Sequence, residues 1–208
     1  MTDGRLLKGE QTRRTILARA ADIASAEGLE GVSIGRLATE LKISKSGVFT
    51  HFGSKEELQL ATVRAAAETF RRHVVEPALA APEGMPRVRA LYEAWQRYQR
   101  EPVFPGGCFF YATVAEFDAR PGRVRDAIAK AERAWSDFTE RCLREARDLG
   151  HLTPETDVAQ LAFELHALCR AGGANALLHD DNAAYARSAQ AIRSRLSTAT
   201  PTPDHPHL

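Results

Sequence analysis

Apolar residues recur at spacings of three and four along most of the chain, which is the pattern of helices with one buried face. The first such stripe runs from Ile16 to Ala24 and predicts a helix over residues 12–27. Thr12 is a suitable N-cap for this helix, and Gly28 ends it in the manner of a C-terminal glycine. The pattern contains no strand-like alternation and no Asn-Gly or Asp-Gly hairpin signal, so the predicted fold class is all-α.

Two short helices follow. Ser33 opens the first, whose apolar residues run from Ile34 to Leu41, and Ser44 caps the second, over residues 45–52. The segment Ser54-Lys55-Glu56-Glu57 is a capping box that opens a fourth helix, which reaches about residue 75.

The rest of the chain continues the helical pattern as far as a tail rich in Pro and Thr. Thr153-Pro154 should open the second of its two long helices, because proline is favoured at the first helical position. The tail, residues 199–208, is predicted to be disordered. The expected helices span residues 87–100, 108–117, 123–149, 155–178 and 183–196.

Composition narrows the class of protein. The net charge of this 208-residue chain is only +1, so a nucleic-acid surface would have to come from local clustering of basic residues. The chain has three cysteines, which is an odd number, and they lie far apart and form no CxxC. This pattern argues against a disulfide framework or a zinc site. The N-terminus does not have the pattern of a signal peptide, and no apolar run is long enough to cross a bilayer. We therefore expect a cytoplasmic protein without membrane contact.

The stretch ISKSGVFTHFGSKEEL, residues 43–58, carries the first functional hypothesis. Two short helices joined by a tight turn are typical of a helix-turn-helix, whose second helix reads base edges in the major groove. Such a helix needs a slender polar outer face, while Val48 and Phe52 would point back to the first helix. A glycine at position 47 fits either close approach to DNA or a packing requirement. The outer face would consist of Lys45, Ser46, Gly47, Thr50 and His51.

The start of the fourth helix suits a phosphate. A helix N-terminus presents free N–H groups and partial positive charge, and Lys55 adds a full charge in the first turn. Glu56 and Glu57 are expected only to complement the cap and the helix dipole. Arg13 and Arg14 near the start of the first helix are further candidates for contact with the DNA backbone.

The segment TILARAADIASAEGLEGVSIGRLATELKISKSGVFTHFGSKEELQLA resembles the DNA-binding domain of tetracycline-repressor (TetR) family regulators, over about residues 12–61. The resemblance implies a homodimeric transcription regulator, most often a repressor that binds a palindromic operator. A small molecule would bind the larger helical domain and release the protein from DNA. By position, Lys45, Ser46, Gly47, Thr50 and His51 fall where the family's recognition helix meets DNA, and Ser33 and Lys55 fall where it holds phosphates.

Two positions depart from the family pattern. The family usually has tyrosine where this chain has Phe49, so Phe49 is expected to keep the packing but to lack the hydroxyl that bonds a phosphate. Gly35 offers no side chain where some relatives reach DNA, and Arg36 beside it is expected to substitute.

The predicted domains are a helix-turn-helix domain at 1–55, a connecting helix at 56–80 and a ligand-binding and dimerisation domain at 81–198. The helices at 123–149 and 155–178 each show more apolar surface than one stripe needs. In the family such a C-terminal pair forms a four-helix bundle with its twin. A run of small residues at 170–176 would permit close helix–helix approach, or would mark a kink or break.

Aromatic residues between positions 95 and 138 point to a ligand pocket, because such pockets are largely apolar with a few placed polar groups. Tyr98, Tyr111, Glu116 and His166 are candidates for those polar groups. Cys108, at a helix start, is either a reactive thiol or a small buried residue. The predicted pocket residues are Trp95, Tyr98, Phe104, Cys108, Tyr111, Phe117, Phe138 and His166.

The sequence contains no G-x-S-x-G, no H-E-x-x-H and no glycine-rich phosphate loop, so neither an enzymatic activity nor a cofactor or metal is predicted. Two alternatives stay open. One is a small helical enzyme or carrier whose N-terminal helices only pack. The other is a regulator switched by the thiol of Cys108.

Overall fold

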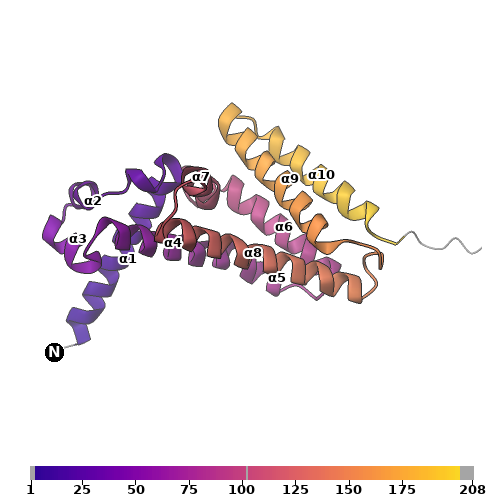
Figure 1. The fold of residues 1–208 in the computed structure, drawn as a ribbon, viewed down its shortest axis with the longest axis horizontal. Helices are drawn as coiled ribbons and strands as arrows, with labels where there is room; N and C mark the ends of the chain where they lie inside the picture. The colour runs from indigo at the N-terminus through magenta and orange to yellow at the C-terminus, as the bar shows by residue number, and fades with distance from the viewer. Residues whose placement is uncertain (1–2, 102, 202–208) are drawn as a thin grey trace, which may run out of the picture. The chain divides into compact units, whose positions relative to one another are not determined.

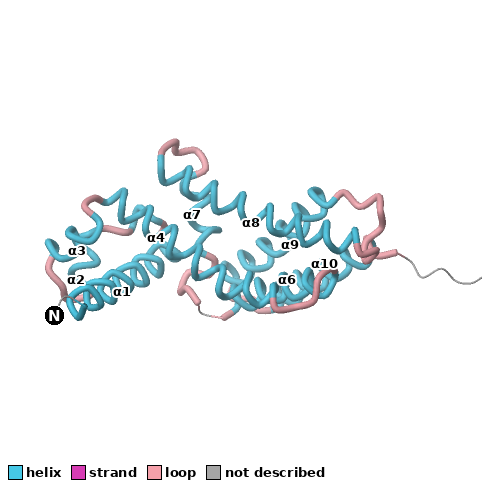
Figure 2. The backbone as a smooth tube through the Cα atoms, turned by 90° about the horizontal axis from the view of Figure 1, so that it is seen from below, coloured by secondary structure: helices cyan, strands magenta, loops and turns pink. Residues whose placement is uncertain are grey.

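The computed structural model describes residues 3–101 and 103–201, with side chains from residue 6 onward. Helices and their connecting turns make up this part of the chain, and it contains no strand (Figure 2). The all-α class is therefore confirmed.

The helices follow one another in the order shown in Figure 1. They are α1 (Asp3–Glu27), α2 (Ile34–Glu40), α3 (Lys45–Phe52), α4 (Lys55–Phe70), α5 (Glu76–Leu79), α6 (Met85–Arg100), α7 (Phe109–Phe117), α8 (Arg123–Asp148), α9 (Val158–His179) and α10 (Ala183–Thr198). A 3-10 turn, η1 (Leu29–Gly31), follows α1, and a π-helical turn, η2 (Arg71–Val75), joins α4 to α5.

The chain forms two compact units. Among the described residues, the first comprises residues 3–70 and 103–132, and the second comprises residues 71–101 and 133–201. The functional segments expected from the sequence, with boundaries at residues 55, 80 and 198, stay a prediction.

The first unit is organised around α1, which packs on α4 and α7, while α2 packs on α3. Its core contains the apolar residues that recur at helical spacing, so burying this stripe removes their surface from water. The buried set includes Ile16, Ala20, Ile23 and Ala24 on α1, Leu37 on α2, Val48 and Phe52 on α3, Leu58 and Ala66 on α4, and Phe109 on α7.

Two predicted helix starts are wrong. Thr12 does not cap α1, which begins at Asp3; its hydroxyl donates instead to the carbonyl of Lys8 one turn back, at 2.9 Å. Thr153-Pro154 does not open α9. Asp157 does so, and its Oδ1 accepts from the N–H groups of Ala159 and Gln160, both at 3.0 Å. An aspartate N-cap satisfies two helix-end donors, which proline at the first position does not.

The second unit packs α6, α9, α10 and the C-terminal part of α8 around Trp95, Leu143 and Leu161. The small-residue run does not break α9, which is continuous through it. A Cβ added at Gly172 would lie 2.4 Å from the Cβ of Ser188 on α10. The predicted role in close helix packing is confirmed, and the packing occurs within one chain.

Of the predicted tail, residues 199–201 are described, and Ala199 is buried with its carbonyl accepting from the N–H of Thr153 at 2.9 Å. Residues 202–208 lie outside the described residues. Among the helices of the described part, none is both long and apolar enough to cross a membrane.

Candidate nucleic-acid interface

The turn between α2 and α3 is tight because Lys42 adopts the left-handed conformation, with φ 56°. This lets the N–H of Ile43 donate back to the carbonyl of Ala38 at 3.0 Å. Ser44 then caps α3, its Oγ accepting from the N–H of Gly47 at 3.0 Å. The tight turn at residues 41–44 thus joins the two short helices, as a helix-turn-helix requires.

Helix α3 has one buried and one exposed side. Val48 and Phe52 are buried against the rest of the first unit, as predicted. The residues expected at DNA all keep exposed surface: Lys45, Ser46 and Thr50 are exposed, and Gly47 and His51 are partly exposed. A Cβ at position 47 would lie 3.0 Å from Ser44 Oγ, which a small shift of the serine side chain would relieve, so both reasons given for this glycine stay open.

The packing predicted for Phe49 is wrong. Its side chain is 54% exposed, so it does not keep the packing expected of the family's tyrosine. An exposed aromatic ring on the outer side of α3 is an apolar surface that can contact a thymine methyl group or a sugar.

Arg13 on α1 holds the C-terminal end of α3. Its Nη1 donates to the carbonyl of His51 at 2.8 Å, and its guanidinium lies 4.5 Å from the centre of the Phe52 ring. A cation at a helix C-terminus offsets the partial negative charge there. From the sequence, Arg13 was a candidate for contact with DNA. In the structure, its guanidinium instead contacts the C-terminal end of α3 and orients this helix.

Arg36 joins α2 to α1. Its two Nη atoms donate to the carboxylate of Glu27 at 2.5 and 2.7 Å, and its Nε donates to Glu40 at 2.8 Å. Its guanidinium holds the pKa values of both carboxyls below their usual range. In the structure, these donors of Arg36 bond to Glu27 and Glu40. Contact of Arg36 with DNA stays a prediction.

Lys55 lies at the start of α4, as predicted, and already has an acidic partner. Its Nζ is 2.8 Å from Glu30 Oε2 and 3.1 Å from the Glu30 carbonyl. Ser54 Oγ accepts from the N–H of Glu57 at 3.1 Å, which confirms this half of the capping box. Glu56 and Glu57 do more than complement the dipole, because both pair with Arg123, at 2.9 and 2.8 Å.

Glu116 on α7 caps the turn η1 that follows α1. Its Oε2 accepts from the N–H of Leu29 at 2.6 Å, and its Oε1 accepts from the N–H of Glu30 at 2.9 Å. Gly28 permits this approach: its φ is 81°, and a Cβ there would lie 2.5 Å from Oε2. Glu116 was expected among ligand-pocket residues, so this prediction is wrong. Glu30 is 86 positions from Glu116 along the chain, so only the folded structure shows that the two residues are in contact.

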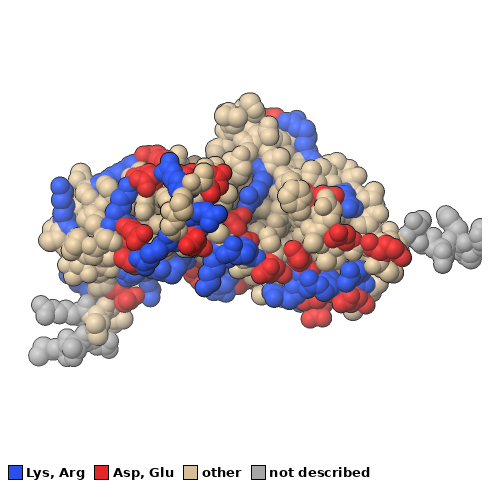
Figure 3. All heavy atoms as spheres, viewed as in Figure 1, with Lys and Arg blue, Asp and Glu red and all other residues tan. Residues whose placement is uncertain are grey.

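Charge on the first unit is mixed. Figure 3 shows acidic side chains among the basic ones over the N-terminal helices, and the ion pairs of Arg36 and Lys55 are examples of this mixture.

Ser33, predicted to open the second helix, caps α2: its Oγ accepts from the N–H of Arg36 at 3.2 Å.

The second unit contains an aromatic cluster around His166. The imidazole stacks on Trp135 at 5.4 Å with 10° between the planes, and Trp95 meets it edge-on at 5.3 Å. Thr139 donates its hydroxyl proton to the Trp135 carbonyl, so His166 Nε2 donates to Thr139 Oγ1, at 3.1 Å. Burial, aided by the charge of Arg170, lowers the pKa of His166 to about 4. The imidazole is therefore neutral at pH 7.

The predicted pocket residues divide between the two units. Trp95, Tyr98, Phe138 and His166 belong to the second unit, while Phe104, Cys108, Tyr111 and Phe117 belong to the first. Trp95 and Tyr98 are buried, and Tyr111 is exposed. A ligand-binding role for these residues stays a prediction.

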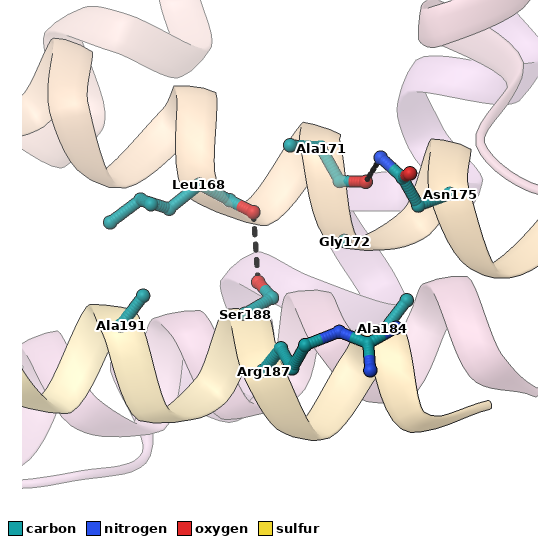
Figure 4. A pocket seen from close by; sticks show the side chains of 8 residues that line it. All are labelled: Leu168, Ala171, Gly172, Asn175, Ala184, Arg187, Ser188 and Ala191. Carbon is teal, nitrogen blue, oxygen red and sulfur yellow. Dashed lines mark hydrogen bonds between the residues drawn. The ribbon is translucent and has the colours of Figure 1, made fainter. Parts of the chain in front are cut away.

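The exposed face of α9 is apolar. Phe163, Leu177 and Leu178 are 69%, 59% and 78% exposed. On α8, by contrast, the large apolar side chains are buried, so the extra apolar surface predicted for the helix at 123–149 is limited to Leu149, which follows α8 and is 53% exposed. A shallow groove runs between α9 and α10, where Ser188 donates to the Leu168 carbonyl and Asn175 to that of Ala171 (Figure 4).

Comparison with known proteins gives consistent matches. Residues 16–62 match the family model "Bacterial regulatory proteins, tetR family", and residues 84–192 match "Tetracyclin repressor-like, C-terminal domain". YezE, an uncharacterised HTH-type transcriptional regulator of Bacillus subtilis (strain 168), is 24% identical over 152 residues, which cover 73% of this chain and 78% of YezE.

Two solved structures show the same fold. A TetR transcriptional regulator from Chloroflexus aurantiacus has a TM-score of 0.85 at 22% identity, over 93% of this chain and 98% of that one. A TetR-family regulator from Streptomyces coelicolor has a TM-score of 0.78 at 23% identity, over 93% and 97% of the two chains.

Proposed function

This chain belongs to the tetracycline-repressor (TetR) family of DNA-binding transcriptional regulators, and we propose that it is a repressor that binds a palindromic operator as a homodimer and is released by a small molecule. Members of this family are regulators and not enzymes. The observation that carries the proposal is the outer side of α3, which is exposed, polar except for Phe49, and held in place from behind by Val48, Phe52 and Arg13.

In this proposal α3 enters the major groove. Lys45, Ser46, Gly47, Thr50 and His51 meet base edges, and Ser33 and Lys55 contact phosphates. Lys55 exchanges Glu30 for a phosphate on binding, which an exposed ion pair permits because such pairs contribute little free energy.

The two copies would pair through the C-terminal helices, with α9 contributing an exposed apolar face. A two-fold axis matches the symmetry of a palindrome and sets the spacing of the recognition helices. The exposed Phe163, Leu177 and Leu178 supply the apolar surface that such an interface buries. These side chains lie on one of the C-terminal helices that were expected to form the bundle.

The effector would bind in the second unit at the aromatic cluster. Trp95 and His166 contribute packed rings there, Phe138 lies beside Trp135, and His166 is neutral, so an uncharged ring-containing molecule would suit the chemistry of this cluster. As a regulator of genes, the protein would act in the cytoplasm, where bacterial DNA is.

The test is retention of genomic DNA fragments by the purified protein at two salt concentrations, compared with a Lys45→Ala/Thr50→Ala variant. We expect a palindromic site enriched at both salts by the wild type and lost in the variant. Retention at low salt only, equal in both proteins, would show unspecific electrostatic association and contradict the proposal. The same fragments, challenged with cell-extract metabolites, test release.

A further inference from the structure

A second hollow lies in the second unit, and its lining includes neither His166 nor the exposed residues of α9, although the ring of Tyr92, which lines it, is centred 6.3 Å from the His166 ring. It is a groove of about 500 Å3 between α6 and α10. This volume lies within the range of small-molecule sites, roughly 300–1,000 Å3. Its lining consists of Arg89, Tyr92, Glu93 and Gln96 on α6, and of Ala189, Ile192, Arg193, Leu196, Ser197 and Thr200 on or just after α10.

The inner part of the groove is apolar. Tyr92, Ile192 and Leu196 are buried and supply rings and aliphatic carbon to the lining. The Tyr92 hydroxyl has no hydrogen-bond partner among the described residues, and burial raises its pKa well above 10. The apolar body of a ligand can therefore lie here without meeting an ionised group.

The rim is charged and positive on balance. Arg89 and Arg193 are both exposed, with one acid, Glu93, among the lining residues. Arg89 makes no ion pair in the described part of the chain. Arg193 donates only to a neutral group there, Gln190 Oε1, at 3.0 Å. Two guanidinium groups whose charges are not neutralised locally attract an anion.

We propose that this groove binds a small amphipathic anion, with its apolar body along Tyr92, Ile192 and Leu196 and its anionic head between Arg89 and Arg193. A carboxylate is the simplest head, because guanidinium donors match its two oxygens. This site is proposed in addition to the effector site at the aromatic cluster, from which it differs in its lining and its charged rim, with Tyr92 lying between the two.

Titration calorimetry with decanoate, below its micelle concentration, tests the proposal. Decyltrimethylammonium has the same chain with the opposite charge and is the matched probe. We expect decanoate to bind wild type about tenfold more tightly than it binds an Arg89→Gln/Arg193→Gln variant, because both head-group partners are lost. Decyltrimethylammonium should bind wild type at least about tenfold more weakly than decanoate does.

Two further variants locate the binding. Arg97→Gln removes an exposed charge from α6 outside the groove and should leave decanoate affinity unchanged. Ala189→Phe fills the groove and should abolish binding. Thermal unfolding by circular dichroism establishes that each variant is folded. If Ala189→Phe does not fold, the Arg89→Gln/Arg193→Gln and Arg97→Gln variants, which change only exposed residues, test the proposal without it. No binding of decanoate by wild type, equal binding of both probes, or unchanged affinity in the double arginine variant would overturn the proposal.

Discussion

Lys55 pairs with the carboxylate of Glu30, and in the proposed function it exchanges this carboxylate for a DNA phosphate. Replacing Lys55 by alanine should weaken binding to all DNA sequences and reduce the slope of log affinity against log salt by about one unit per half-site, because one phosphate contact is lost. Glu30→Gln should act in the opposite direction, since it removes the competing carboxylate. Fluorescence anisotropy across a salt series measures both. An unchanged slope in Lys55→Ala would show that Lys55 only pairs with Glu30.

His166 makes stability depend on pH. Its pKa is about 4 in the folded protein, below its value of 6.5 in a model peptide, so the unfolded chain binds a proton that the folded protein excludes. The contribution is therefore fully present above pH 6.5 and is lost as the pH falls toward 4, by about 1.4 kcal/mol per pH unit.

We expect the free energy of unfolding of wild type to fall by about 2 kcal/mol more than that of His166→Gln between pH 7 and pH 5. Glutamine can still donate to Thr139, so the comparison isolates the titration. Urea unfolding at the two pH values measures it. An equal fall in both proteins would mean that His166 is protonated in the folded state.

At the scale of elements, Glu116 ties α7 to the turn after α1. Glu116→Gln loses the charge and turns one end of the side chain into a donor that faces a backbone N–H. The amides of Leu29 and Glu30 should then exchange with solvent faster, and the free energy of unfolding should fall by about 1–2 kcal/mol. Hydrogen exchange and urea unfolding are the measurements. Glu155→Gln, at an exposed residue, is the control and should change neither.

The elements that sequence could predict are those set by local spacing. The stripe on α1, the caps at Ser33, Ser44 and Ser54, and the turn before α3 all depend on residues within a few positions of one another. The contacts that sequence missed join distant segments. Arg13 reaches His51 across 38 positions and Glu116 reaches η1 across 86, and neither partner is marked by a local pattern.

Candidate ligand residues show the same limit. Aromatic residues near one another in sequence looked like one pocket, yet Phe104 and Phe117 pack in the first unit while Trp95 and Phe138 pack in the second. The spacing of apolar residues along a helix determines which side of that helix is buried. Which helices it is buried against depends on the path of the chain between them.

At the scale of the whole molecule, the proposed function couples DNA binding to the pairing of two copies. Two recognition helices bind a palindrome cooperatively only if the two copies hold them at a fixed spacing. Phe163→Glu should therefore weaken pairing at least about 100-fold, because it removes apolar burial and, across the two-fold axis, introduces repelling charges. Sedimentation velocity over a concentration series measures the dissociation constant.

Leu79→Glu is the matched control, because it places the same charge at a half-exposed leucine on α5 instead of α9. It should leave both pairing and operator affinity unchanged. Phe163→Glu should lose operator affinity in parallel with pairing while leaving α3 intact, so its binding of a single half-site should equal that of wild type. A Phe163→Glu protein that still pairs would place the interface on another face. One that is monomeric and yet binds the whole palindrome at full affinity would show that pairing is not needed for DNA recognition.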